Sequence, residues 1–175
     1  MTIVFDNTPL SHFARACRLA ELEAITEGHR RVTTEAVRGE LEDALAQHPE
    51  IDEVLRLPWL EVVSTGTLNE LRAFAEYARR LGTGVRNVGE ASVLAWAEVN
   101  AAIAIVDERA ATNHGRERRV DVHGSLWLVC EGYRVGQLDQ PAAEALVDAL
   151  RATQIWFPCS GATFFDWARR EGLLP

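Results

Sequence analysis

The sequence contains no lysine, and its 18 strongly basic residues are all arginines. A chain without lysine cannot form a Schiff base, build a Walker-A phosphate site or support a lysine-assisted aspartyl phosphate. The simplest explanation of the arginine bias is codon usage in a GC-rich genome. The formal charge of −8 argues against a protein that coats nucleic acid non-specifically. A nucleic-acid ligand would have to be held locally, by metal ions and a few arginines.

Cysteine is also scarce: Cys17, Cys130 and Cys159 are odd in number and never form a CxxC pair. They are therefore expected to be buried free thiols in a reducing cytoplasm. The apolar run at the N-terminus stops at Asp6, which is too short for a signal peptide or a membrane span. A chain of 175 residues with 47% hydrophobic residues is expected to form one domain over residues 1–175, located in the cytoplasm.

Short apolar runs alternate with amphipathic stretches along the chain, which predicts an α/β domain with a parallel sheet covered on both faces. Strands are predicted at residues 3–5, 31–33, 58–63, 102–106 and 120–122. Helices are predicted at residues 10–16, 19–26, 34–47, 67–81, from 90 onward, from after residue 108 to about 118, 124–134 and 141–151, with a loop at 82–89 and an aromatic-rich tail over 155–175. Thr67 and Glu70 have the spacing of a capping box.

Two aspartates follow apolar strands directly: Asp6 after Ile3–Phe5 and Asp107 after the run that ends at Val106. Sites in open parallel sheets form at the carboxyl ends of strands. Either aspartate alone is explained equally well as a helix or turn cap. Together, on neighbouring strands, they predict a place where metal could bind.

Two glutamates extend this acidic set. Glu90 lies in the first turn of its helix and in line with Leu94 and Ala97, so it is expected to point along the buried face. A favourable interaction with the helix dipole is the alternative explanation. Glu40 stands beside Leu41 at the border of an apolar face, where periodicity alone favours a solvated side chain.

Carboxylates that converge at a sheet edge repel one another unless cations neutralise them. Oxygen ligands without histidine or cysteine favour Mg²⁺ or Mn²⁺ over zinc. The five histidines show no zinc-binding spacing.

Five segments, taken in order, resemble the PIN-domain nucleases, including the VapC-type toxins and a group of short predicted nucleases. They are residues 4–11 (VFDNTPLS), 33–41 (TTEAVRGEL), 89–95 (GEASVLA), 105–111 (IVDERAA) and 122–126 (VHGSL). The resemblance implies a three-layer fold with a small central parallel sheet flanked by helices.

Under this resemblance, four acids match the family's metal-binding and catalytic quartet: Asp6, Glu40, Glu90 and Asp107. Thr8, Arg109 and Ser125 match positions near the substrate. The resemblance implies Mg²⁺- or Mn²⁺-dependent hydrolysis of RNA, in the manner of the toxin of a toxin–antitoxin pair. It further implies a small antitoxin-like inhibitor protein and a homodimer. The chain departs from the family pattern at Glu108, where relatives often have aspartate, and at Thr112, where they have the arginine expected to contact phosphate.

Two alternatives belong to other classes. One is a catalytically idle PIN fold that binds nucleic acid or protein, against which the four intact acids argue. The other is a phosphotransfer domain of the haloacid dehalogenase or receiver type, which needs a lysine that the chain lacks. For partner binding, Phe164 and Phe165 in the tail are candidates for an exposed apolar patch, although packing in the core is the simpler explanation.

Overall fold

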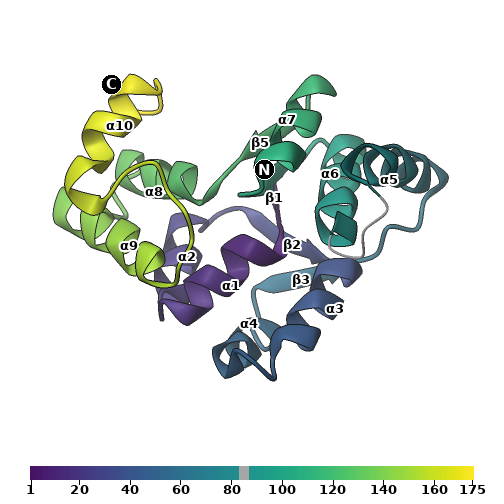
Figure 1. Ribbon diagram of the computed structural model, residues 1–175, viewed down its shortest axis with the longest axis horizontal. Coiled ribbons are helices and arrows are strands. Elements are labelled where there is room, and N and C mark those ends of the chain that lie inside the picture. Colours follow the sequence, from purple (N-terminus) through teal and green to yellow (C-terminus); the bar gives the residue numbers. More distant parts are fainter. Residues whose placement is uncertain (83–86) are drawn as a thin grey trace.

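The computed structural model describes residues 1–82 and 87–175. Its centre is a parallel five-stranded sheet in the order β3-β2-β1-β4-β5 (Figure 1). The strands are β1 (Thr2–Phe5), β2 (Arg30–Thr34), β3 (Leu60–Val63), β4 (Ile103–Ile105) and β5 (Asp121–His123). The predicted α/β class with a small parallel sheet flanked by helices is confirmed.

Helices connect the strands and continue beyond the last one. Before β4 the chain forms α1 (Asn7–Arg15), α2 (Leu19–Ile25), α3 (Glu35–Ala44), the short η1 (Pro49–Ile51), α4 (Asp52–Leu55), α5 (Leu68–Leu81) and α6 (Val88–Asn100). After β4 it forms α7 (Arg109–Glu117), α8 (Ser125–Arg134), α9 (Gln140–Ala152), the short η3 (Gly161–Thr163) and α10 (Phe164–Arg170).

Strand β1 from Ile3 to Phe5 and strand β4 throughout are apolar because both faces of the sheet are covered. Ile3, Val4 and Phe5 are at most 2% exposed, and β4 is buried throughout. The register pairs Phe5 with Ile105, so β1 and β4 end side by side. The residue that follows each strand therefore reaches the same edge of the sheet.

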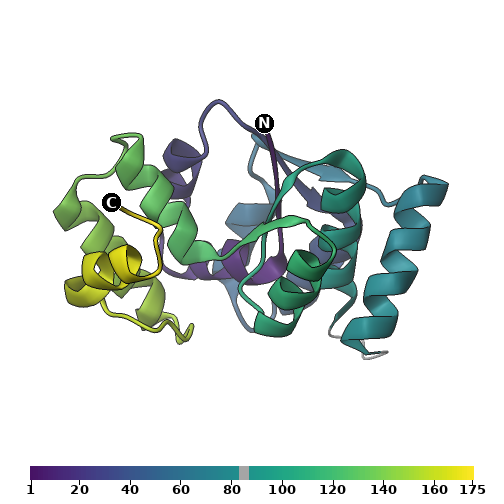
Figure 2. The same cartoon turned by 90° about the horizontal axis from the view of Figure 1, so that it is seen from above.

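Helix α6 packs on β1, β2 and β4, and α5 packs on α6. The helices after β5 gather at one end of the molecule, where α8 contacts α2 and α9 contacts α1 (Figures 1 and 2). None of the described helices is long and apolar enough to cross a membrane.

Several helix boundaries differ from the predicted ones. Helix α1 begins at Asn7 rather than residue 10, because the Asp6 side chain accepts a hydrogen bond from the Thr8 amide and caps the helix. Helix α3 ends at Ala44 rather than at residue 47. Helix α6 begins at Val88, two residues before the predicted start; the predicted loop at 82–89 lies partly outside the described residues. The capping box between Thr67 and Glu70 is confirmed.

The aromatic pair in the tail does not form an exposed patch. Phe164 is fully buried and Phe165 is 6% exposed, so the expectation that they form apolar surface is wrong and core packing is correct. Trp156 of the same tail is instead 82% exposed. Cys17 is exposed, against the expectation of burial, whereas Cys130 and Cys159 are buried; all three are free.

Candidate active site

Asp6 lies at the carboxyl end of the central strand β1. Its backbone amide donates to the carbonyl of Ile105 on β4 over 3.0 Å, which continues the sheet pairing one residue beyond the strand. Its side chain is only 1% exposed. The position follows from the sequence, since an apolar strand that runs into an aspartate leaves the carboxylate at the sheet's rim.

The carboxylate of Asp6 accepts few hydrogen bonds for a buried group. Oδ2 accepts from the Thr8 amide over 3.4 Å, and Oδ1 has no hydrogen-bond partner among the described residues. Burial raises the pKa of Asp6 well above its ordinary value, and the negative charges of Glu90 and Glu40 raise it further. Such a group favours a proton or a cation close to Oδ1.

Glu40, on α3, is turned inward rather than along a solvated flank. Its Oε1 accepts from the Gly89 amide over 2.9 Å, and its Oε2 accepts from the Asn7 amide group over 3.4 Å. A Cβ at position 89 would lie 2.6 Å from Oε2, so glycine is what lets the carboxylate reach the α6 backbone. Burial raises the pKa of Glu40 most, and the Gly89 hydrogen bond partly opposes that rise.

Glu90 stands in the first turn of α6, as predicted, and is half-buried. Its Oε2 is buried without a hydrogen-bond partner among the described residues. Burial raises its pKa, and the charge of Glu108 adds to the rise. Within the described part of the chain, Asp6 and Glu90 thus each present one buried, unpaired carboxylate oxygen.

Asp107 follows β4 and is held firmly by Ser125. The Ser125 amide donates to Oδ1 over 2.7 Å, and its hydroxyl donates to Oδ2 over 2.6 Å. A Cβ at position 124 would lie 2.7 Å from Oδ1, so Gly124 makes room for the carboxylate. Burial raises the pKa of Asp107 although both hydrogen bonds from Ser125 lower it.

The four acids divide into two parts. In the first part, the charges of Glu40 and Glu90 raise the pKa of Asp6, and the charge of Glu90 raises the pKa of Glu40. In the second part, Ser125 holds Asp107 by hydrogen bonds at the end of the adjacent strand. Within residues 1–82 and 87–175, no three histidine, cysteine, aspartate or glutamate side chains are arranged closely enough to hold one metal ion. The donors nevertheless fit Mg²⁺ or Mn²⁺ in kind, being carboxylates only. The unpaired oxygens of Asp6 and Glu90 are where such an ion would compensate buried charge.

The other predicted residues lie around these acids. Thr8 is half-buried on α1 and contacts Asp6 through its backbone amide. Arg109 is exposed at the start of α7. Glu108, which replaces the family's second aspartate, caps α7 by accepting from the Ala111 amide over 2.7 Å. Thr112 donates its hydroxyl to the carbonyls of Glu108 and Val106, so it supplies no cation for phosphate.

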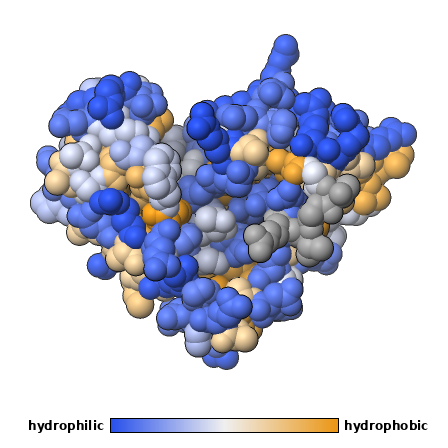
Figure 3. Space-filling model, viewed as in Figure 1, coloured by the Kyte–Doolittle hydropathy of each residue, from blue (hydrophilic) through white to orange (hydrophobic). Residues whose placement is uncertain are grey.

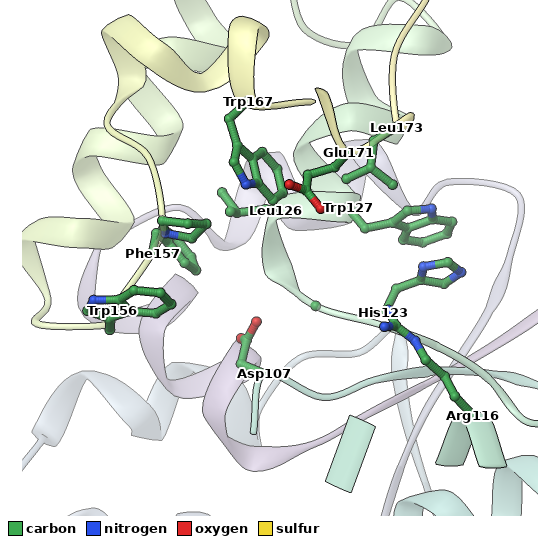
Figure 4. Close-up of a pocket in the computed structure, with 12 residues that line it drawn as sticks. Asp107, Arg116, His123, Leu126, Trp127, Trp156, Phe157, Trp167, Glu171 and Leu173 are labelled. Atoms are coloured by element: carbon green, nitrogen blue, oxygen red, sulfur yellow. The ribbon is translucent and has the colours of Figure 1, made fainter. Parts of the chain in front are cut away.

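The sequence did not reveal a pocket of about 380 Å³ that opens beside Asp107. Figure 4 shows Asp107 at one side of it, Trp156 and Trp167 on the C-terminal segment, and Trp127 next to His123. These residues come from parts of the chain up to 60 residues apart, and no spacing rule connects them. Only the three tryptophans in the last third of the chain could have drawn attention to it.

A family model described as the PIN domain matches residues 2–162 of the chain. The match includes the five strands, the four acids and Ser125, and ends before α10. Neither the curated proteins nor the solved structures gave a significant match.

Proposed function

This chain belongs to the PIN-domain family, whose members are generally nucleases, and we propose that it hydrolyses phosphodiester bonds in RNA with the help of Mg²⁺ or Mn²⁺. The observation that carries the proposal is the state of Asp6. Its carboxylate is buried at the end of the central strand, is flanked by Glu40 and Glu90, and has one oxygen without a hydrogen-bond partner in residues 1–82 and 87–175. A buried anion of this kind costs several kcal/mol unless it is compensated, roughly as for any uncompensated ion in a protein interior.

In this proposal, Asp6 and Asp107 would be the principal metal ligands, with Glu90 beside them. Glu40 would bind a second ion, directly or through water. A bound ion would lower the pKa of a water molecule and stabilise charge on the leaving oxygen. Ser125 orients Asp107 through two hydrogen bonds, and the Gly89 amide orients Glu40. Thr8 and the exposed Arg109 are the groups proposed to contact the phosphate backbone.

The test is cleavage of a labelled single-stranded RNA, and of DNA of the same sequence, with Mn²⁺ or with EDTA. Asp6→Asn and Asp107→Asn should each lower the Mn²⁺-dependent rate on RNA by several orders of magnitude. Asp166→Asn, at an exposed residue of α10, is the matched control and should cleave like the parent. Equal rates in all four proteins would disprove this site. RNA binding without any Mn²⁺-dependent cleavage would support the catalytically idle alternative.

We also propose a homodimer and a small inhibitor protein, as in a toxin–antitoxin pair. Apolar surface for such contacts is present on α5 and α6, where Leu71 and Val88 line one depression with Phe74 and where Leu68 is 62% exposed. Leu71→Glu should weaken self-association, measured by sedimentation at tens of micromolar. A parent protein that sediments as a monomer would contradict the dimer. The three free cysteines support a reducing, cytoplasmic location.

A further inference from the structure

The pocket beside Asp107 lies between two parts of the molecule. One wall is the segment from β5 into α8, with His123 and Trp127; the other is the C-terminal segment, with Trp156, Trp167 and Glu171 (Figure 4). The surface is notched between the C-terminal helices and the region of α7 (Figure 3). A volume of about 380 Å³ lies within the range of small-ligand sites, roughly 300–1,000 Å³.

Aromatic side chains are concentrated around this pocket. Three of the chain's five tryptophans line it: Trp127, Trp156 and Trp167. Trp156 is 82% exposed, so its indole ring is open to solvent and is not packed in the core. Unpaired bases of single-stranded nucleic acid bind to such rings by stacking.

The opposite wall already contains a stacked pair. The rings of His123 and Trp127 lie 4.2 Å apart at an angle of 11°. Burial lowers the pKa of His123 despite the neighbouring Asp121, so the imidazole is neutral at pH 7. The wall thus presents flat, uncharged rings, with Trp156 facing it from the other side (Figure 4).

The polar groups of the pocket suit a base better than a bare phosphate. Asp107 and Glu171 are anionic, and Arg116 is the cation at the rim. Among the described residues, neither the Glu171 carboxylate nor the Arg116 guanidinium makes an ion pair or a side-chain hydrogen bond. A carboxylate can accept two parallel N–H bonds. Guanine has two adjacent donors on its Watson–Crick edge, whereas uracil has one.

We propose that this pocket is a nucleobase subsite, which stacks one unpaired base of the RNA on Trp156 and prefers guanine through Glu171. The proposal rests on the proposed nuclease function, because Asp107 belongs both to the acidic site and to the pocket. A strand held at the acids therefore has a neighbouring base within reach of the tryptophans. Trp167 and Glu171 lie beyond the matched residues 2–162, so the preference belongs to this chain rather than to the family match.

The test measures binding without cleavage. Quenching of tryptophan fluorescence is followed in EDTA with two RNA heptamers, UUUGUUU and UUUUUUU. The parent should bind UUUGUUU more tightly by at least roughly 5-fold, as expected for one well-stacked, hydrogen-bonded base. Trp156→Ala should weaken UUUGUUU binding by about 10-fold. Glu171→Gln should abolish the preference and leave the affinity for UUUUUUU unchanged.

Two exposed residues away from the pocket supply matched controls: Glu27→Gln and Val135→Ala should bind both RNAs like the parent. Equal affinity of the parent for the two heptamers would overturn the proposal. So would a Trp156→Ala protein that binds RNA normally but loses self-association in sedimentation, because the pocket would then be a protein interface.

The two proposals fail in different ways. A guanine preference that depends on Glu171, in a protein that does not cleave RNA with Mn²⁺, would support the subsite and contradict the nuclease. Mn²⁺-dependent cleavage by a protein with no base preference in the binding assay would support the nuclease and contradict the subsite.

Discussion

Ser125 donates both its backbone amide and its hydroxyl to the two carboxylate oxygens of Asp107, over 2.7 and 2.6 Å. The serine is fully buried at the start of α8, so its position is fixed by the core. Asp107 therefore has a defined orientation at the end of β4 before any ligand binds. A metal ligand that is already held in place loses little conformational entropy when a metal binds.

Replacing this serine tests how much the orientation matters. Ser125→Ala removes the hydroxyl bond to Oδ2 and keeps the amide bond to Oδ1. Loss of such a supporting partner should lower Mn²⁺-dependent cleavage by about 10- to 100-fold and the free energy of unfolding by about 1–2 kcal/mol. Cleavage kinetics and urea denaturation measure both. Ser64→Ala, at an exposed serine outside the site, is the control, and an equal effect of the two substitutions would contradict the role of Ser125.

Gly89, which contacts Glu40 in space, and Gly39, which precedes it in sequence, make a matched pair for substitution. A Cβ at position 89 would lie 2.6 and 2.7 Å from the Glu40 carboxylate oxygens, whereas a Cβ at position 39 meets nothing within 4 Å. Gly89→Ala should displace Glu40 and reduce cleavage by at least roughly 10-fold. Gly39→Ala, inside α3, should keep full activity and add up to about 1 kcal/mol of stability. Unchanged cleavage by Gly89→Ala would show that the orientation of Glu40 is not needed.

The raised pKa of Asp6 predicts how stability depends on pH without metal. In the unfolded chain Asp6 ionises near 3.8, and in the folded protein its pKa is well above that. The stability given by protonated Asp6 is therefore complete below pH 3.8 and is lost as the pH rises through the folded pKa. The melting temperature of Asp6→Asn relative to the parent, measured in EDTA, should increase from pH 4 towards neutrality. A difference that stays constant with pH would contradict this, and Asp166→Asn controls for general charge effects.

Divalent metal should reverse that destabilisation. An ion that binds only the folded protein stabilises it by mass action, by about 2.7 kcal/mol at a concentration 100 times its Kd. Thermal melts with increasing Mn²⁺ should therefore show a rising midpoint in the parent and a much smaller rise in Asp6→Asn and Glu90→Gln. Sodium chloride at matched ionic strength is the control. If millimolar Mn²⁺ and Mg²⁺ leave the melting temperature of the parent unchanged, that result would argue against metal binding at these acids.

The positions of Asp6 and Asp107 at the ends of strands could be predicted because they depend only on the residues directly before them in the sequence. The apolar runs before Asp6 and Asp107 mark buried strands, and the carboxyl ends of neighbouring parallel strands meet. That β1 and β4 are neighbours could only be assumed from the sequence, because neither run shows which strand it pairs with. The inward turn of Glu40 was not predictable from helix periodicity, because it depends on the Gly89 amide, which lies 49 residues away in sequence.

Other features were missed for related reasons. Residues Pro49–Leu55 form η1 and α4 with Ile51 and Val54 buried, yet three apolar residues in a stretch of only seven are too few to establish a helical period. The tail's aromatic residues divide into buried Phe164 and exposed Trp156, which composition alone cannot separate. The pocket depends on how α8 and α10 are placed in space.

The pairing of Ile3 with Ile103 has a consequence for synthesis of the protein. The central strand is made first, but its partner on one side is translated a hundred residues later. Until β4 has left the ribosome, Asp6 lacks the Ile105 carbonyl to which its amide donates, and Asp107 has not been made or has not reached its place. The acidic edge therefore cannot assemble on a short nascent chain, and an RNA-cleaving activity at this edge would arise only after more than half of the protein has been translated.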